Sequence, residues 1–182
     1  VFKKLYLNGA VYRGRKPIHW CSHCHTALAE AEIEYADETS PSIYVNFKLN
    51  NIPAAFAEAG VDLERAYVLI WTTTPWTLPS NTAVSLGPDI DYCFVEADGK
   101  FMMFAKDMVE AVAKVAGWES YRIVEANGEP VTMKGDQFGD ITYICPVLHE
   151  NTGRIIWGEH VTLDAGTGAV HTAPGHGVDD YK

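Results

Sequence analysis

Hydrophobic and polar residues alternate between positions 43 and 49, which is the pattern of a strand with one buried face. The apolar positions are Ile43, Val45, Phe47 and Leu49. An uninterrupted apolar run from Tyr67 to Trp71 predicts a second strand, buried on both faces. The segments 91–97 and 100–105 flank Asp98-Gly99, a dipeptide that favours positive φ angles, and together they predict a hairpin with a two-residue turn.

Two helices are predicted among these strands. The stronger runs from about Ala105 to Ala116, with apolar residues on one face, and ends at Gly117. The shorter covers 53–59 and stops at Gly60. Further strands are predicted at 121–124, 141–148, 154–157, 160–163 and 168–172. Many short strands and few helices indicate an α+β fold, which we expect to be a β-rich, compact, barrel-like domain with a few peripheral helices.

Composition narrows the class of protein. The 182 residues include 24 acidic and 14 basic side chains, for a formal net charge of −10, and 47% are hydrophobic. These values exclude wholesale disorder and the binding of a long polyanion through bulk charge. Because no apolar run approaches the ~20 residues of a membrane helix, we expect a cytoplasmic protein with no membrane partner. The chain begins at Val1 and stops just after an incipient helix, so we expect a piece of a longer protein.

The segment Cys21-Ser22-His23-Cys24-His25 fits two metal-binding patterns. One is the covalent haem attachment motif, which is the weaker hypothesis because it also needs export and an axial partner. The other is half of a structural zinc site, formed by Cys21 and Cys24, whose second cysteine pair would lie outside this sequence. A metal or haem carrier built on this segment therefore stays open as one function.

Two longer stretches carry the most chemistry. Residues 71–81, Trp71-Thr72-Thr73-Thr74-Pro75-Trp76-Thr77-Leu78-Pro79-Ser80-Asn81, place five hydroxyls and an amide after a buried strand, with two prolines restricting the backbone. Residues 166–181 are rich in glycine, contain His171, and end in Asp179-Asp180-Tyr181. Glycines permit close approach of a backbone to a ligand, and the aspartates offer fixed negative charge for a cation. The two stretches predict the two halves of a small-ligand site.

Together the two stretches resemble the editing domain that is inserted into the catalytic core of isoleucyl-tRNA synthetases. Residues 71–81 are similar to the threonine-rich motif of that family, and residues 166–181 to its glycine-rich motif with an acidic anchor. The related valyl and leucyl domains carry Thr-Thr-Arg-Pro where this chain has Thr73-Thr74-Pro75-Trp76, and they lack a histidine at the place of His171. The resemblance implies a stem at 1–40 leading into the insertion and an editing domain at 41–182.

The resemblance implies hydrolysis of misacylated tRNA. An apolar pocket gains only ~1–3 kcal/mol from one methylene, so the synthetic site of this family discriminates poorly between isoleucine and valine. A second site that excludes isoleucine by size would therefore hydrolyse valine esterified to tRNA(Ile). Partners would be the tRNA 3′ end carrying valine and the remainder of the synthetase. The domain itself would need no cofactor and no metal in its site, whereas ATP and magnesium would serve the synthetic site elsewhere in the full-length enzyme.

The resemblance also implies roles for individual residues. Thr72, Thr73 and Thr74 would bind the ester region and orient water, and Asp180 would hold the substrate ammonium, with Asp179 as the alternative anchor. Trp76, Thr77 and His171 would shape the side-chain pocket, His171 would block isoleucine, and Asn81 would support the threonine loop. A module of the same sequence could instead bind an amino acid or the tRNA end without catalysis, and that alternative stays open.

Overall fold

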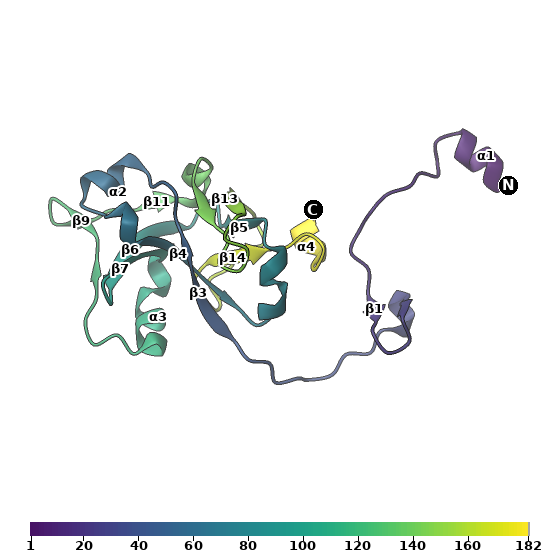
Figure 1. Cartoon of the computed structure of the whole chain (residues 1–182), viewed down its shortest axis with the longest axis horizontal. Helices are drawn as coiled ribbons and strands as arrows, with labels where there is room; N and C mark the ends of the chain where they lie inside the picture. Colours follow the sequence, from purple (N-terminus) through teal and green to yellow (C-terminus); the bar gives the residue numbers. More distant parts are fainter. Residues whose placement is uncertain (182) are drawn as a thin grey trace. The chain divides into compact units, whose positions relative to one another are not determined.

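The computed structural model describes residues 1–181, and the chain divides into two compact units. The larger comprises residues 38–173, and the smaller comprises 1–37 together with 174–182. In Figure 1 the larger unit contains both main sheets, and the smaller includes the purple N-terminal segment and the yellow C-terminal helix.

The larger sheet of the larger unit has six strands in the order β11-β6-β7-β4-β3, with β8 pairing β6. Its members are β3 (Ile43–Lys48), β4 (Ala66–Thr72), β6 (Asp91–Ala97), β7 (Lys100–Ala105), β8 (Arg122–Ile123) and β11 (Met133–Lys134). The predicted hairpin is confirmed, because β6 and β7 pair antiparallel around Asp98 and Gly99, which both have positive φ. β4 runs parallel to β7 and antiparallel to β3. Its successive residues Val68, Leu69 and Ile70 are all buried, so the prediction of a strand covered on both faces is confirmed.

The second sheet has four strands in the order β12-β13-β5-β14. Its members are β5 (Ala83–Leu86), β12 (Thr142–Ile144), β13 (Thr152–Trp157) and β14 (Ala169–Thr172). The two sheets meet where Leu49, just after β3, bridges Tyr143 of β12, and where the amide of Asn50 donates to the carbonyl of Thr142 at 2.9 Å. A short separate hairpin is formed by β9 (Glu125–Ala126) and β10 (Glu129–Pro130).

Helices flank the sheets. They are α2 (Ala54–Glu58) and α3 (Val109–Ala116), with the 3₁₀ turns η2 (Leu63–Arg65), η3 (Pro75–Ser80), η4 (Lys106–Met108) and η5 (Gly135–Phe138). Both predicted helices are confirmed, although the stronger begins as the 3₁₀ turn η4. It ends at Gly117 in the left-handed conformation, as expected of a glycine after the last helical turn. The core between the elements is rich in fully buried aromatic side chains: Phe47, Phe56, Phe94, Phe104, Phe138, Tyr92 and Tyr143.

The α+β, β-rich fold is confirmed, but a closed barrel is not found among residues 1–181. Each sheet ends in edge strands, β11 and β3 in one and β12 and β14 in the other, and the described pairings close neither sheet on itself. The strand predicted at 160–163 is wrong, because those residues form turns and bends between β13 and β14. Residues 75–80 form a 3₁₀ helix, since Pro75 sets φ for a helical first turn.

The smaller unit has little regular structure. It contains α1 (Phe2–Leu7), the hairpin of β1 (Trp20–Cys21) and β2 (Thr26–Ala27), the 3₁₀ turn η1 (Glu30–Glu32), and α4 (Val178–Tyr181). The predicted short helix after residue 177 is thus present as α4. Its Tyr181 hydroxyl donates to the carbonyl of Arg15, which ties the two parts of this unit together.

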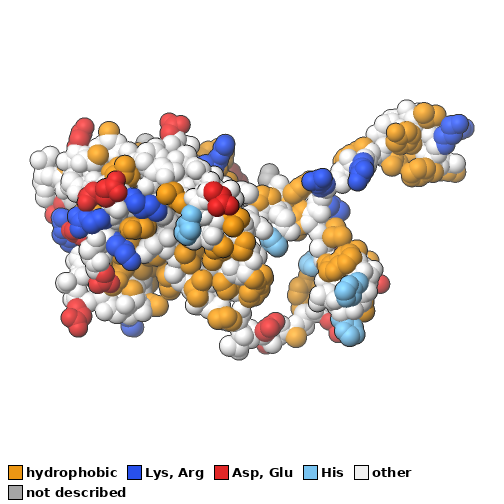
Figure 2. Space-filling model, viewed as in Figure 1, with side chains coloured by type: hydrophobic (Ala, Val, Ile, Leu, Met, Phe, Trp, Pro, Cys, Tyr) orange, Lys and Arg blue, Asp and Glu red, His pale blue; other side chains and the backbone are white. Residues whose placement is uncertain are grey.

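Charged side chains of both signs are interspersed on the face of the larger unit that Figure 2 shows, so that face presents no single basic surface. This agrees with the acidic net charge of the chain. Within residues 1–181, no helix is both long enough and apolar enough to cross a bilayer.

Candidate functional site

The threonine row lies at the end of β4, where the buried strand turns into η3. Thr72, the last residue of β4, is buried, whereas Thr73 and Thr74 are exposed. The Thr72 hydroxyl accepts a hydrogen bond from the amide of Thr74 at 3.0 Å and lies 3.2 Å from the Thr74 hydroxyl. Ser40 caps the turn from outside by donating to the Thr73 carbonyl at 3.0 Å. The row therefore presents hydroxyls held by local hydrogen bonds at a strand end.

The turn of η3 carries Thr77 back toward the row. Its amide and its hydroxyl both donate to the carbonyl of Thr74, at 3.0 and 2.9 Å. The same hydroxyl lies 2.8 Å from Nε2 of His171 on β14. His171 pairs with Val84 of β5 in the sheet register, which places the imidazole beside the segment that precedes β5. Two predicted halves of the site, 71–81 and the strand part of 166–181, are thus brought together.

Asn81 completes the contact between these halves. Its side-chain nitrogen donates to the carbonyl of Ala83 at 2.9 Å and lies 2.7 Å from Nδ1 of His171. A carbonyl oxygen is only an acceptor, so the atom facing Ala83 is the amide nitrogen. The amide nitrogen therefore also donates to Nδ1 of His171, which leaves the imidazole proton on Nε2, where it is donated to Thr77.

Tyr143 fixes the opposite end of the Asn81 amide. The fully buried phenol donates to Oδ1 of Asn81 at 2.6 Å, and the Cys145 thiol lies 3.5 Å from the same oxygen. Burial raises the pKa of the Tyr143 phenol well above its usual range, so this hydroxyl stays protonated and available as a donor. The hydrogen bonds thus run in one direction, from Tyr143 through Asn81 and His171 to Thr77 and the carbonyl of Thr74.

Tyr143 and Cys145 were not identified from the sequence. They lie in a predicted strand with no motif around them, and only the register of β12 brings them to Asn81. Ser85 and Thr172 form a second buried polar pair behind His171, with their hydroxyls 2.8 Å apart. The only signal for these residues in the sequence is that each is a polar residue within an apolar strand. The sequence does not show which of them contact one another.

The direction of these bonds limits the chemistry of His171. The ring is 8% exposed, and each of its nitrogens is engaged inside the protein. A general base needs an available lone pair within reach of the proton that it removes. Nδ1 accepts from Asn81 and Nε2 carries the proton, so neither ring nitrogen in this state offers a free lone pair to a substrate.

The glycine-rich segment is held to the larger sheet by Tyr92. Its hydroxyl donates to the carbonyl of Gly168 and accepts from the amide of Gly87 at 2.8 Å. Burial raises the pKa of this phenol to about 12. Gly166 has positive φ, and a side chain there would come within 2.9 Å of the Trp71 ring. Close packing of backbone on this ring explains the glycine.

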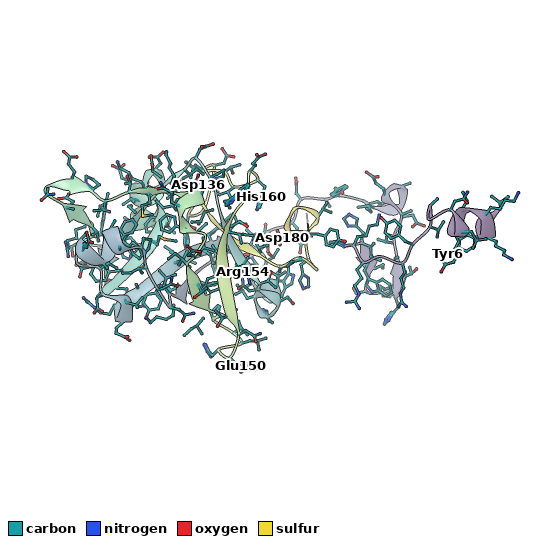
Figure 3. All side chains as sticks on the ribbon, turned by 90° about the horizontal axis from the view of Figure 1, so that it is seen from above. Tyr6, Asp136, Glu150, Arg154, His160 and Asp180 are labelled. Atoms are coloured by element: carbon teal, nitrogen blue, oxygen red, sulfur yellow. The ribbon has the colours of Figure 1, made fainter. Side chains whose placement is uncertain are left out.

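The remaining predicted residues are Trp76, Asp180 and Asp179. Trp76 on η3 is 65% exposed, so its indole is open to solvent at the edge of the threonine row. Asp180 lies on α4, labelled in Figure 3, in the smaller unit, and its role as an anchor stays a prediction. Asp179 is on the same helix, and its side chain lies outside the described part of the chain.

The two cysteines of the predicted zinc half-site lie around the tight turn of the β1–β2 hairpin. The amide of Cys24 donates to Sγ of Cys21 at 3.3 Å, and backbone donors at Cys24 and His23 lower the pKa of the Cys21 thiol. Thiolate character at Cys21 suits a soft metal ligand. Within residues 1–181 no cluster of three or more potential metal ligands is found, and the zinc half-site stays a prediction.

Comparison with known sequences places the chain in a family. The sequence model of the family described as tRNA synthetases class I (I, L, M and V) matches residues 1–148. An isoleucine–tRNA ligase of Caldanaerobacter subterraneus subsp. tengcongensis is 45% identical over 181 residues, which cover 100% of this chain and 19% of the ligase. One from Desulfovibrio desulfuricans is 47% identical over 178 residues, covering 98% and 18%. The chain thus spans about a fifth of the length of these relatives.

Solved structures agree in fold. The editing domain of the P. knowlesi cytosolic leucyl-tRNA synthetase superposes with a TM-score of 0.58 at 12% identity, covering 80% of this chain and 63% of that chain. The corresponding P. falciparum domain gives a TM-score of 0.53 at 13% identity, covering 64% and 44%. At these identities the likeness concerns the fold, which is that of a synthetase editing domain. The chain therefore belongs to the class I tRNA synthetases of the group that comprises the I, L, M and V enzymes.

Proposed function

We propose that this domain hydrolyses the ester bond between valine and the terminal adenosine of tRNA(Ile), and that it spares isoleucine because of its size. The observation that carries the proposal is the fixed contact of His171 with Thr77 and Asn81, beside the hydroxyl row of residues 72–74. The relatives named isoleucine–tRNA ligase and the fold of the leucyl-tRNA synthetase editing domains support it.

The proposed chemistry needs little covalent help from the protein. An aminoacyl ester is already activated, so that positioning a water against its carbonyl supplies much of the rate enhancement. Thr73 and Thr74 are exposed, and their hydroxyls are available to hold the ester and the attacking water, whereas the buried Thr72 hydroxyl orders the turn. Hydroxyl and amide donors at the row would stabilise the oxyanion that develops during attack.

The proposed size selection rests on His171. The imidazole is held at both nitrogens, so it cannot rotate away from a larger side chain without breaking two hydrogen bonds. A rigid wall gives discrimination that a mobile one does not, because a substrate must displace it to enter. Trp76, exposed beside the row, would contribute the solvent-side wall of the same pocket.

The remaining elements of the proposal come from the resemblance in sequence. Asp180, with Asp179 as the alternative, would hold the substrate ammonium through a charge-assisted hydrogen bond. The partners would be the tRNA 3′ end carrying valine and the rest of the synthetase, which would supply the main phosphate contacts. The hydrolysis would use no cofactor or metal in this domain, and Cys21 with Cys24 would form half of a zinc site completed elsewhere.

The direct test compares deacylation of tRNA(Ile) charged with valine and with isoleucine, by this chain and by a full-length ligase that contains it. Loss of valine with isoleucine spared supports both the hydrolysis and the size selection. A full-length ligase with an intact synthetic site that deacylates neither ester would contradict the proposal. The domain would then be a module that binds the amino acid or the tRNA end without turnover.

A further inference from the structure

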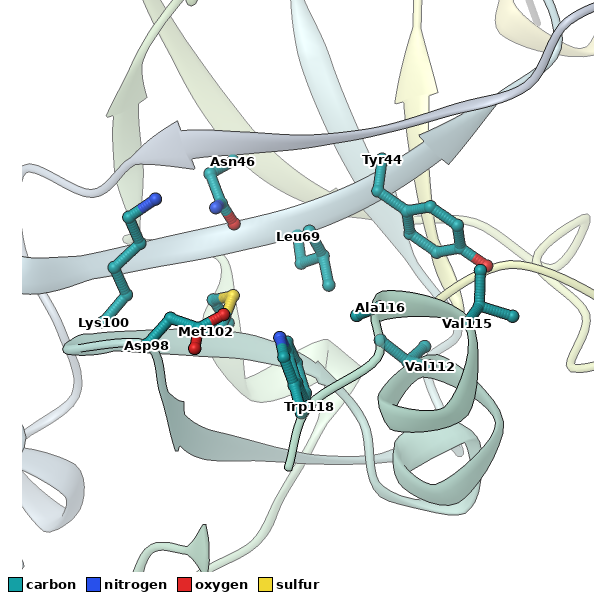
Figure 4. A pocket seen from close by; sticks show the side chains of 10 residues that line it. All are labelled: Tyr44, Asn46, Leu69, Asp98, Lys100, Met102, Val112, Val115, Ala116 and Trp118. Atoms are coloured by element: carbon teal, nitrogen blue, oxygen red, sulfur yellow. The ribbon is translucent and has the colours of Figure 1, made fainter. Parts of the chain in front are cut away.

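A pocket in the larger unit lies on the side of β4 away from the threonine row. Leu69 lines it, and Thr72 stands three positions further along the strand; since side chains alternate between faces, the two point to opposite sides. The pocket has a volume of about 210 Å³ and lies between the sheet and α3, as Figure 4 shows. This volume is below the ~300–1,000 Å³ of typical drug-sized ligand sites. A ligand of amino-acid size suits it.

The two ends of the pocket differ in character. Figure 4 shows Tyr44, Val112, Val115 and Ala116 at the end toward α3, with Leu69 and Trp118 in the middle. The opposite end, near the β6–β7 turn, holds the polar side chains Asn46, Asp98 and Lys100. A bound molecule would therefore carry its polar atoms at one end and an apolar group at the other.

Asn46 has a buried oxygen without a donor. Its Oδ1 atom is inaccessible to solvent, and no hydrogen bond to it is found among the described residues. A buried carbonyl oxygen left unpaired costs about 1–3 kcal/mol, so such an atom in a native fold requires a reason. A small rotation of the amide toward the pocket would expose this oxygen to an N–H donor of a bound ligand, which would then satisfy it.

The charged side chains at this end of the pocket indicate what kind of ligand would supply that donor. No ion pair of Asp98 is found within residues 1–181, and its carboxylate faces the pocket in Figure 4. Lys100 places its ammonium 5.9 Å from the centre of the Tyr67 ring, on the same side of the sheet as Asn46. One negative and one positive group beside an unpaired acceptor match a molecule that carries both an ammonium and a carboxylate.

We propose that this pocket binds a free α-amino acid with an aliphatic side chain, at a site separate from the threonine row. The ammonium would donate to Asn46 Oδ1 and to the Asp98 carboxylate, and the carboxylate would pair with Lys100. The side chain would lie against Leu69, Met102 and Val112. This inference does not depend on the proposed hydrolysis.

The test is a titration of the ¹⁵N-labelled chain, followed through the indole N–H signal of Trp118, which is assigned with Trp118→Phe. Three probes separate the charges: L-leucine, 3-methylbutylamine, which lacks the carboxylate, and 4-methylpentanoate, which lacks the ammonium. We expect a saturable shift with leucine in the millimolar range or tighter, a weaker response to the amine, and none to the acid.

Variants locate the binding. Asp98→Asn should weaken leucine and amine binding about tenfold, the loss of one charge-assisted contact, while Lys100→Met should weaken leucine but not the amine. Asp136→Asn, an exposed aspartate outside the pocket lining, and Thr73→Ala in the threonine row should leave the titration unchanged. Absence of a saturable shift with leucine, an equal response to 4-methylpentanoate, or indifference to Asp98→Asn in a folded protein would each overturn the proposal.

Discussion

The phenol of Tyr143 lies 2.6 Å from Oδ1 of Asn81, and the other end of that amide lies 2.7 Å from Nδ1 of His171. A residue of the second sheet thus holds, through one side chain, a ring on another strand of the same sheet. Because the phenol is fully buried and protonated, it always donates, which keeps the amide nitrogen directed at the imidazole. The orientation of His171 therefore depends on a residue that it does not contact through a hydrogen bond.

Replacing Tyr143 with phenylalanine should remove this donor while keeping the ring. We expect a loss of about 1 kcal/mol in the free energy of unfolding. We also expect a roughly 3- to 10-fold lower ratio of valine to isoleucine deacylation, because His171 is then less firmly held. Thermal denaturation and the two deacylation rates measure the effects separately.

The control for this substitution is Tyr35→Phe, which removes a hydroxyl from a side chain that is 87% exposed. It should change neither quantity. If Tyr143→Phe lowers both deacylation rates in parallel and leaves their ratio untouched, the hydroxyl supports the fold but does not position His171.

Gly153 on β13 explains how the Tyr143 ring fits. The two residues pair across β12 and β13, and a Cβ at position 153 would come within 2.2 Å of the ring. Gly153→Ala should therefore destabilise the protein by about 1–3 kcal/mol or more, as in other overpacked cores. The matched control is Gly139→Ala, where φ is ordinary and nothing lies within 4 Å of the added methyl. Equal melting temperatures for the two variants would show that the ring moves without cost.

Strands and helices could be predicted from the sequence where the pattern of hydrophobic and polar residues extends over a whole element. The strands at 43–49 and 67–71, the hairpin around Asp98-Gly99 and the helix before Gly117 each combine a clear period with a turn or cap residue. The strand β5 was missed because its four residues show no regular alternation of polar and apolar positions. The segment 160–163 was misread because an alternation over only four residues does not distinguish a strand from a packed loop.

The residues of the candidate site also fall into a group that the sequence predicts and a group that it does not. Thr77, Asn81 and His171 belong to motifs that are continuous in sequence, and they do meet in the structure. Tyr143 reaches them only through the register of β12, a non-local property that periodicity does not carry. The closed barrel was expected because many short strands suggest it, but the number of strands does not determine whether the edge strands pair.

Tyr92 should contribute to a fall in the stability of the larger unit at high pH, in addition to Tyr143 and Cys93, whose pKa values burial also raises. The folded protein raises the pKa of the Tyr92 phenol to about 12, whereas the unfolded chain has the ordinary value near ~10. The folded state thus retains the proton that the unfolded state loses. The stabilisation is complete below about pH 10 and is lost as pH rises toward 12, by up to about 3 kcal/mol.

Denaturant melts at pH 9 and pH 11 measure this loss, and Tyr92→Phe is the comparison because it has no proton to lose. The variant should be less stable than the parent at pH 9, since the bonds to Gly168 and Gly87 are gone, and the difference should narrow at pH 11. A difference that stays constant with pH would contradict the assignment to Tyr92.

The proposed anchor is tested by Asp180→Asn, which keeps the shape of the side chain and removes its charge. If Asp180 holds the substrate ammonium, valine deacylation should fall about 10- to 100-fold, the value of a charge-assisted hydrogen bond. The fold should persist, as the melting temperature will report. Asp37→Asn, an exposed aspartate of the same unit, is the control. Retained hydrolysis in Asp180→Asn would transfer the anchor role to Asp179 or another residue.

The role of His171 is decided by comparing two substitutions. His171→Ala removes the bulk of the ring, so isoleucine should enter and Ile-tRNA(Ile) should be deacylated, while valine deacylation continues. His171→Phe keeps the bulk but loses both hydrogen bonds, so isoleucine should still be spared, at a stability cost of about 1–3 kcal/mol for the unpaired Asn81 amide. If His171 were instead the general base, both variants would lose valine deacylation by about 10²–10⁴-fold. A loss of valine deacylation of that size in both variants would refute the proposal that His171 only limits the size of the pocket. A residue with that role can be removed or replaced without displacing the attacking water.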